Sequence, residues 1–209
     1  MQVQGIGLLK NLSRCPVDVA RVPNFLSPHP VVLVTSAFGA RENVAVVPWY
    51  TMVNERPPKI VLSVGLKSLT YELIARSNQF GINVPTLSAH PDHISLETII
   101  KCSNDIATDR KENDQFGVLG LTKLPATFFG MKVPLIGECV AHVECSVIGK
   151  TDEIGDHVVF WGTVLAASAV EGCLDQEGYF SSLLTFPILQ DLGRGHFSSI
   201  CGWMEFEKK

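Results

Sequence analysis

The sequence predicts a mainly β protein, an antiparallel barrel with helical insertions, from three observations. Strand-like apolar runs gather toward the two ends of the chain, and helix-like segments stand between them. This order lacks the regular strand–helix alternation of a doubly wound parallel sheet. No Gly-x-Gly-x-x-Gly follows a strand and no Gly-x-Ser-x-Gly occurs, which disfavours a dinucleotide-binding fold and an α/β-hydrolase. An antiparallel barrel is the architecture that fits best.

The first half of the chain contains four strand candidates and one helix candidate. A β-branched run is typical of a buried strand, and the turn at 39–42 joins the first two strands into a predicted hairpin. Pro85 ends the fourth strand, because proline has no N–H for the next ladder bond. The predicted strands are 31–37, 43–50, 59–65 and 80–85, and the predicted helix is 68–77.

The second half begins with helical segments and returns to strands. Apolar residues behind Asp92 repeat with roughly helical spacing, and a shorter helix is expected at 114–119. The strand candidates that follow are long, and a loose region separates them from the last one. They lie near 138–148, 157–169 and 197–206, with the loose region at 178–195.

Composition describes an ordinary globular chain and excludes several classes of function. The 209 residues are 46% hydrophobic and 18% charged, which predicts one domain over 1–209 with a large core. Net charge is −4 and no basic block occurs, so sequence-independent nucleic-acid binding has no electrostatic basis. Apolar runs are short, and the N-terminus does not resemble a signal peptide. Six dispersed cysteines without a Cys-x-x-Cys then indicate reduced thiols in a cytoplasmic protein that does not enter membranes.

Cys139, His142 and Cys145 raise a metal-site hypothesis, which their positions in a strand weaken. Alternation along a strand places the two cysteines on one side and His142 on the other. Packing of the thiols in the core is therefore favoured over metal binding, and no metal is expected.

The segment from Gly65 to Ile74 is the strongest local signal of a ligand. A strand stops at Gly65, and a helix begins after Lys67 with Ser68 and Thr70 in its first turn. The first turn of a helix carries unpaired N–H groups and the positive end of the helix dipole, which together favour anions. This pattern suggests a phosphorylated ligand. The alternative is that Ser68 only caps the helix while Lys67 is solvated.

Several ordered segments together resemble the flavin reductase-like family, also described as the FMN-binding split barrel, and particularly its flavoredoxin branch. The resemblance covers roughly residues 24 to 170 and implies a Greek-key split β-barrel. The matching segments are 30–36, 43–53, 56–64, 68–74, 79–86, 114–116, 120–122, 134–139 and 144–145.

The resemblance also implies a cofactor, a donor and partners. Members bind FMN at a homodimer interface, many take hydride from NADH or NADPH, and some pass electrons to a protein. The implied cofactor-binding residues are Trp49, Tyr50, Thr51 and Met52 along the ring, Lys67, Ser68 and Thr70 at the phosphate, Asn83 in a closing strand, and Arg110 facing the ligand. No catalytic acid or base is predicted, because flavin carries the hydride chemistry itself.

Some alternatives remain open at this level. Alternation lets either Trp49 and Thr51 or Tyr50 and Met52 face a ligand, and we expect the first pair. Asn83 has a structural explanation as strong as the functional one. The favoured function is an NAD(P)H:flavin oxidoreductase. The alternatives are a flavoredoxin-like FMN electron carrier reduced by a partner protein, and a non-catalytic barrel that holds another cofactor.

Overall fold

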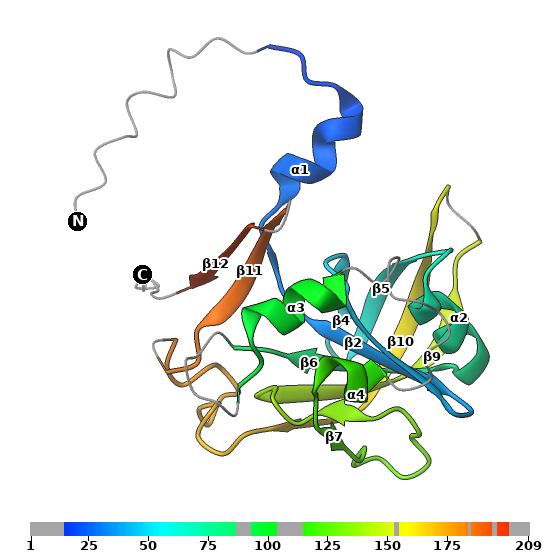
Figure 1. The fold of residues 1–209 in the computed structure, drawn as a ribbon, viewed down its shortest axis with the longest axis vertical. Helices are drawn as coiled ribbons and strands as arrows, with labels where there is room; N and C mark the ends of the chain where they lie inside the picture. Colours follow the sequence, from blue (N-terminus) through cyan, green and yellow to red (C-terminus); the bar gives the residue numbers. More distant parts are fainter. Residues whose placement is uncertain are drawn as a thin grey trace.

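A seven-stranded antiparallel sheet dominates the computed structural model (Figure 1), which describes residues 15–86, 93–103, 115–152, 155–183, 185–193 and 196–200. The strand order is β3-β2-β6-β9-β10-β5-β4, and every neighbouring pair is antiparallel. Its strands are β2 (Leu33–Phe38), β3 (Arg41–Val46), β4 (Tyr50–Asn54), β5 (Lys59–Gly65), β6 (Gln79–Val84), β9 (Ala141–Lys150) and β10 (His157–Ala169). The predicted antiparallel β class with helical insertions is thus confirmed.

Two small sheets and the helices surround this large sheet. One small sheet has the order β1-β11-β12, and the other pairs β7 with β8. Their strands are β1 (His29–Pro30), β7 (Lys123–Leu124), β8 (Leu135–Ile136), β11 (Ile188–Gly193) and β12 (His196–Ile200). The helices are η2 (Val19–Arg21), α1 (Val22–Leu26), α2 (Leu69–Ser77), α3 (Leu96–Ser103) and α4 (Gln115–Leu119). Among the described residues, no helix is long and apolar enough to cross a membrane.

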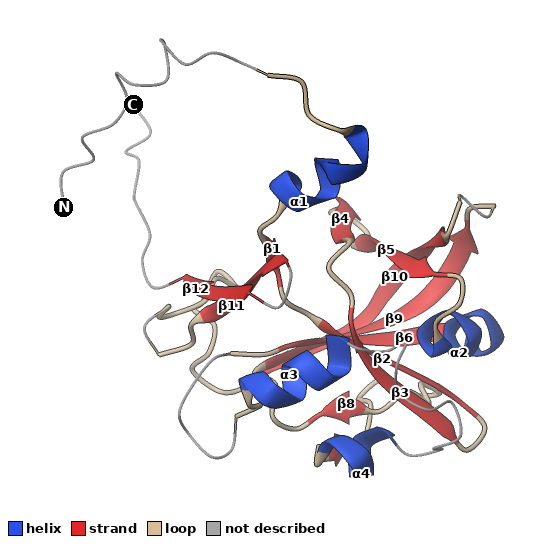
Figure 2. Ribbon diagram, turned by 45° about the horizontal axis from the view of Figure 1, so that its top comes forward, coloured by secondary structure: helices blue, strands red, loops and turns tan. Residues whose placement is uncertain are grey.

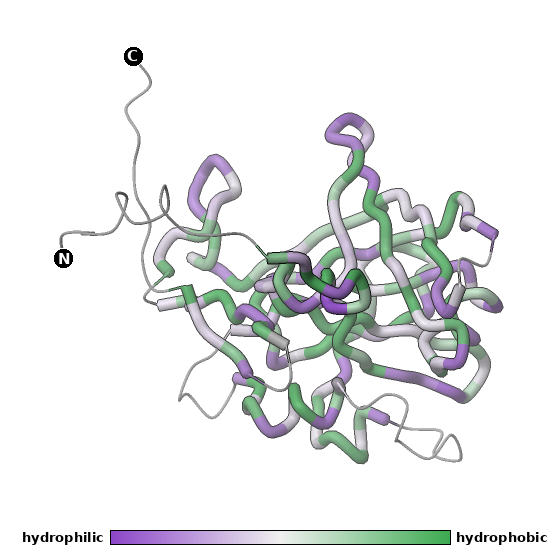
Figure 3. The backbone as a smooth tube through the Cα atoms, turned by 90° about the horizontal axis from the view of Figure 1, so that it is seen from above, coloured by the Kyte–Doolittle hydropathy of each residue, from purple (hydrophilic) through white to green (hydrophobic). Residues whose placement is uncertain are grey.

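Helices α2, α3 and α4 cover the β2–β3 part of the sheet, as Figure 2 shows, whereas α1 extends away from it. α2 packs against both strands, and α3 and α4 pack against β3 and against each other. Figure 3 shows hydrophobic stretches along the crossing strands in the middle of the molecule and hydrophilic stretches in the outer loops. The core therefore lies on both sides of β2.

Alternation along β2 divides the core into two clusters. Val34 packs into one cluster with Leu62, Phe80 and Phe160, inside the barrel. Leu33 points the other way, into a second cluster with side chains of α3 and α4. A strand that is buried on both faces reads as a continuous apolar run, which explains why this strand was recognisable from its sequence.

The predicted strand 43–50 matches β3 as far as Val46 but is wrong beyond it, because the chain breaks there and changes sheet edge. β3 ends at Val46 and β4 begins at Tyr50, on opposite edges of the seven-stranded sheet. The Val47 N–H still donates to the Val32 carbonyl at 3.4 Å, whereas the Trp49 carbonyl accepts from Ser63 N of β5 at 2.9 Å. Pro48 stands between them and has no N–H to continue the first ladder. Residues 47–49 thus connect the two edges of the sheet.

Other expectations also need correction. The loose region at 178–195 contains β11, which pairs with β1 and β12. The last strand begins at His196, and the described residues end at 200. Cys139 precedes β9 and lies in the α3-side cluster, so it does not share a face with Cys145, which lies inside the barrel. Burial raises the pKa of the Cys145 thiol to about 12.

Candidate functional site

A cavity of about 400 Å³ lies at the crossing between β3 and β4. The crossing forms one wall, the end of β5 and the start of α2 form another, and the start of β10 completes it. The lining residues are Ala45, Val46, Val47, Pro48, Trp49, Ser63, Val64, Gly65, Lys67, Ser68, Thr70, Ser103, Asp156 and His157. The lining thus includes Trp49 and the three residues predicted for a phosphate, Lys67, Ser68 and Thr70.

The start of α2 is a capped helix N-terminus that faces this cavity. The Ser68 hydroxyl accepts from Tyr71 N at 3.1 Å and donates to the Gly65 carbonyl at 2.7 Å. The Ser68 N–H also donates to that carbonyl, at 3.0 Å. Ser68 therefore caps the helix, as the structural alternative expected. Its hydroxyl hydrogen is already engaged by the Gly65 carbonyl, so Ser68 acts here as the helix cap rather than as a hydroxyl donor to an anion.

Thr70, which lines the cavity, makes a side-chain hydrogen bond that the sequence did not reveal. Its Oγ1 accepts from Asn43 Nδ2 at 2.8 Å, and both side chains are buried. The amide of Asn43 therefore fixes the rotamer of Thr70 beside the start of α2. An asparagine inside a strand, where its propensity is low, was the only sequence signal of this role.

The cavity lining also carries two aromatic rings. The rings of Trp49 and His157 lie 4.9 Å apart and are tilted by 44°. Nδ1 of His157 lies 2.7 Å from Oδ1 of Asp156, and this hydrogen bond holds the pKa of the carboxyl below its usual value. The Nε2 atom of His157 is close to Gly65, 3.8 Å from where a Cβ would stand. Sequence reasoning missed Asp156 and His157, although a Gly-Asp-His turn directly before a long strand was visible.

A second cavity of about 320 Å³ continues from the first along the outer face of the sheet. The register pairs Tyr50 with the core residue Leu62, and Thr51 with Val61. Directly paired residues share a face, so Thr51 faces outward and Tyr50 packs against the barrel interior. Burial raises the pKa of the Tyr50 hydroxyl. The second cavity is lined by His29, Pro48, Trp49, Tyr50, Thr51, Val61, Ser63 and Val159.

Two predicted site residues line neither cavity, and a third lies outside the described residues. Met52 lines neither of them. Asn83 is fully buried, donates from Nδ2 to the Leu33 carbonyl at 2.9 Å and accepts from Ile136 N at 2.9 Å. Its amide thus ties β6 to β2 and β8, which is the structural explanation. Arg110 lies outside the described residues.

Comparison with known proteins establishes the family. Residues 25–186 match the flavin reductase like domain, which is most of the chain, and the protein therefore belongs to the flavin reductase-like family. A protein of Pyrococcus abyssi without an assigned function is 33% identical over 141 residues, which are 68% of this chain and 74% of that protein.

Solved structures with the same fold carry different activities. Flavoredoxin from Methanosarcina acetivorans superposes with a TM-score of 0.76 at 20% identity, covering 93% of this chain and 95% of that one. An FMN-binding protein from Thermus thermophilus gives 0.73 at 18% identity, with coverage of 94% and 98%. A Streptomyces globisporus NADH:FAD oxidoreductase gives 0.68 at 19% identity, with coverage of 91% and 100%. At these identities the likeness shows the fold.

Proposed function

We propose that this protein binds FMN in the cavity at the start of α2 and transfers hydride from NADH or NADPH to the flavin. The observation that carries the proposal is the arrangement of the cavity. Its lining combines a helix N-terminus with Lys67 and Thr70, and it also includes the ring of Trp49. A phosphate fits a helix N-terminus with a nearby cation, and a flat aromatic ring fits beside an aromatic side chain.

Together, the residues that line the cavity offer the kinds of contact that FMN requires. The first turn of α2 supplies N–H donors and a positive dipole, and Lys67 adds a cation at the same end. Gly65 has no side chain and leaves room beside His157. The two cavities share the lining residues Pro48, Trp49 and Ser63, so a ligand with a charged group and a planar ring can extend from one into the other.

The chain's own contribution is binding and orientation. FMN, when bound, supplies the hydride acceptor, and the protein supplies position and electrostatics. Trp49 and Val159 offer an apolar wall, while Asp156 holds the ring of His157 against Trp49. His157 is exposed enough to contact a second ligand, which suits a nicotinamide donor that enters and leaves in each turnover. No side chain is required to act as a general acid or base.

A direct experiment compares NADH and NADPH as reductants of the FMN-loaded protein without oxygen. The proposal expects bleaching of the flavin absorbance by at least one nicotinamide, at a rate well above that of free FMN. The variant His157→Ala, loaded with FMN at saturation, tests the proposed nicotinamide contact and should slow the bleaching. Bound FMN that neither nicotinamide reduces faster than free FMN would contradict the hydride-transfer part of the proposal.

A flavoredoxin-like electron carrier is the second candidate. The exposed position of Trp49, whose accessible fraction is 41%, favours it because a ring held there has an edge within reach of a partner protein. Similarity of fold to a flavoredoxin agrees with this alternative. Rapid reduction of the bound FMN by a redox protein, with both nicotinamides inert, would select the carrier over the oxidoreductase.

A further inference from the structure

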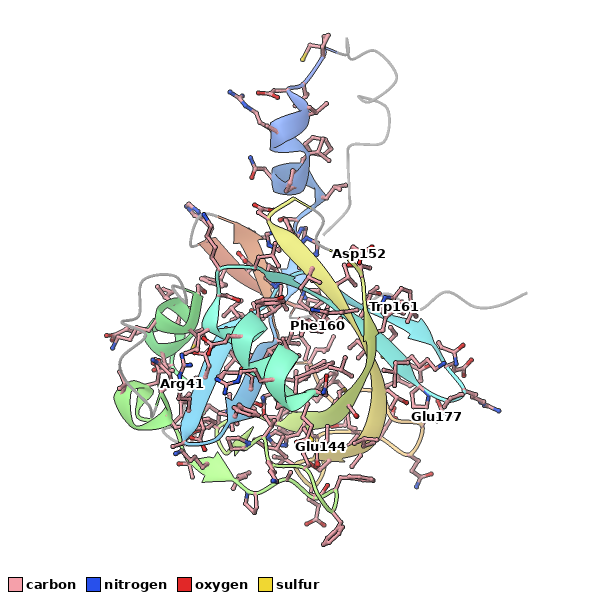
Figure 4. All side chains as sticks on the ribbon, turned by 90° about the vertical axis from the view of Figure 1, so that its right-hand side faces the viewer. Arg41, Glu144, Asp152, Phe160, Trp161 and Glu177 are labelled. Atoms are coloured by element: carbon pink, nitrogen blue, oxygen red, sulfur yellow. The ribbon has the colours of Figure 1, made fainter. Side chains whose placement is uncertain are left out.

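One face of β3 contacts the start of α2 and ends at the wall of the first cavity. Arg41, Asn43 and Ala45 are two residues apart along this strand and therefore share a face. Arg41 Nη1 lies 2.6 Å from Glu72 Oε1 of α2, and Figure 4 shows Arg41 beside that helix. Asn43 donates from Nδ2 to Oγ1 of Thr70, in the first turn of the same helix, at 2.8 Å. Ala45 lines the cavity itself. Two polar contacts from β3 thus hold the start of α2 next to the cavity.

The hydrogen bond between Asn43 and Thr70 has a direction, which determines what the threonine hydroxyl can do. An amide NH₂ group only donates hydrogen bonds, whereas a hydroxyl has one hydrogen to donate and an oxygen that accepts. Because the oxygen of Thr70 accepts from Asn43 Nδ2, the hydrogen of Thr70 has to be donated to a different group. Thr70 lines the cavity, so an anion bound there can be that acceptor. The contact with Asn43 therefore favours a donor role of Thr70 toward a ligand.

The position of Thr70 in α2 agrees with a role outside the helix backbone. A threonine inside a helix often donates to the carbonyl three or four residues before it, which for Thr70 means residues 66 and 67. Both of these precede α2, which begins at Leu69. The cap of the first turn is Ser68, whose hydroxyl accepts from Tyr71 N at 3.1 Å. Neither capping nor the usual helical bond accounts for a buried threonine at this position.

The energetic cost of burying this polar contact also argues for a ligand. Asn43 and Thr70 are each 1% exposed, and burying polar groups costs free energy. An apolar pair of the same shape would hold α2 against β3 nearly as well, because replacing both partners of a buried hydrogen bond is often close to neutral. Ser36 of β2 pairs directly with Asn43, and among the described residues its buried Oγ has no hydrogen-bond partner. Packing alone therefore does not explain why this contact is polar.

We propose that Asn43 is a positioning residue that makes the cavity selective for a phosphorylated ligand. Its amide turns the hydrogen of the Thr70 hydroxyl toward the ligand, where this hydrogen bonds a phosphate oxygen beside the first turn of α2. Hydrogen bonds to ionised groups are stronger than those between neutral groups, so the direction of this hydroxyl distinguishes a phosphorylated flavin from an unphosphorylated one. The inference rests on the proposed function, because it places the phosphate of FMN at the start of α2.

The test measures how much more tightly FMN binds than riboflavin, by fluorescence titration of the wild type and of Asn43 variants. Asn43→Asp replaces the amide by an acceptor of the same shape, which takes the hydrogen of Thr70 and adds a negative charge near the phosphate. The preference for FMN should fall about tenfold or more, as expected when a hydrogen bond to a charged group is lost. Asn43→Leu only removes the amide and should lower the preference less. Riboflavin affinity should change little in both variants.

The matched control is Arg41→Met, which removes the other polar contact between β3 and α2 and keeps the Asn43–Thr70 bond. This variant should keep the wild-type preference for FMN, because Arg41 helps to hold the helix but does not orient Thr70. The double variant N43L/T70V should show the same preference as Thr70→Val alone, since Asn43 acts through Thr70. Circular dichroism checks that each variant is folded, and the apolar pair in N43L/T70V keeps the test possible if Asn43→Asp does not fold.

The outcomes separate this inference from the proposed function. An Asn43→Asp variant that keeps the wild-type preference for FMN, or an Arg41→Met variant that loses it equally, would overturn the role of Asn43 while FMN binding at α2 stands. A preference lower in N43L/T70V than in Thr70→Val would also overturn it, because Asn43 would then act by another route. A wild type that binds FMN and riboflavin equally would contradict the proposed function, and this inference with it.

Discussion

The two faces of β10 carry side chains in different environments, one inside the barrel and one outside it. The inner face carries Val158 and Phe160, which are almost fully buried in the barrel cluster. The outer face carries His157, Val159 and Trp161, two of which line cavities and one of which is exposed. Residues that stabilise the core therefore alternate along this strand with residues that face the cavities or the solvent. A substitution on one face is expected to change folding, and a substitution on the other to change recognition.

The largest expected effect separates Phe160 from Trp161. Phe160→Ala should reduce the free energy of unfolding by about 3–5 kcal/mol, because it empties a fully buried aromatic position. Trp161→Ala should cost about 1 kcal/mol or less, because that side chain is already partly in water. Urea unfolding at one fixed protein concentration measures both. Similar losses for the two variants would show that the faces of β10 do not divide in this way.

The next prediction compares two carboxylates, the buried Glu144 and the exposed Asp156. Glu144 is buried on β9, and its carboxylate accepts from Thr127 N at 2.8 Å, Thr127 Oγ1 at 2.6 Å and Phe128 N at 2.9 Å. Burial alone would raise the pKa of Glu144, but these hydrogen bonds outweigh burial and lower it. Glu144→Ala should cost about 2–3 kcal/mol, because three donors lose a charged acceptor.

The pH dependence of the Glu144 effect has a defined sign. A carboxyl whose pKa is lowered by folding stabilises the protein above its unfolded pKa, and this contribution disappears as pH falls through the folded pKa. The difference in unfolding free energy between the wild type and Glu144→Ala should therefore have its full value at neutral pH. It should shrink on acidification below about pH 4.3. Asp156→Ala, at the exposed outer site, is the control and should change the unfolding free energy little. A gap for Glu144→Ala that widens on acidification would contradict the assignment.

The next prediction concerns FMN binding, where the expected effect of removing the Thr70 hydroxyl is smaller than the stability effects above. Thr70→Val removes a hydroxyl from the cavity wall while keeping its shape, and Thr70→Ser keeps the hydroxyl as the matched control. FMN affinity should fall about tenfold for the valine variant, since a hydrogen bond to a charged group contributes about 1.5 kcal/mol or more. Riboflavin affinity should change little, because riboflavin has no phosphate. Equal weakening of both ligands would place Thr70 away from the phosphate.

The smallest expected effect concerns the charge of Lys67. Lys67→Met should weaken FMN binding several-fold at low salt, and the difference from the wild type should fade as ionic strength rises, because salt screens exposed charges. Fluorescence titrations at low and high salt measure this change. A loss of affinity that is independent of salt would mean that the stem of the side chain, rather than its charge, contributes.

The sequence revealed the elements whose pattern is local. β5 and α2 were predicted closely, because an alternating or helical apolar pattern and a serine cap are written in consecutive residues. The break at Pro48 was misread, because the change of partner from β2 to β5 is decided by strands distant in sequence. β11 was missed for the same reason, since its partners β1 and β12 flank it from both ends of the chain.

The candidate site was partly visible for similar reasons. Lys67, Ser68 and Thr70 follow one another at a helix start, so a local pattern disclosed them. His157 reaches the same cavity from β10, and Asn43 of β3 hydrogen-bonds the cavity residue Thr70; only the sheet topology brings them there. Asn83 was ambiguous because a buried amide serves equally well as a tie between strands and as a ligand contact.

A side-by-side fluorescence titration of the purified protein with FMN and riboflavin tests the central claim most directly. The claim is that the cavity binds a flavin with its phosphate at the start of α2. We expect saturable binding of FMN with an affinity at least tenfold above that of riboflavin. Equal affinities for the two flavins, or no binding of FMN, would contradict the claim.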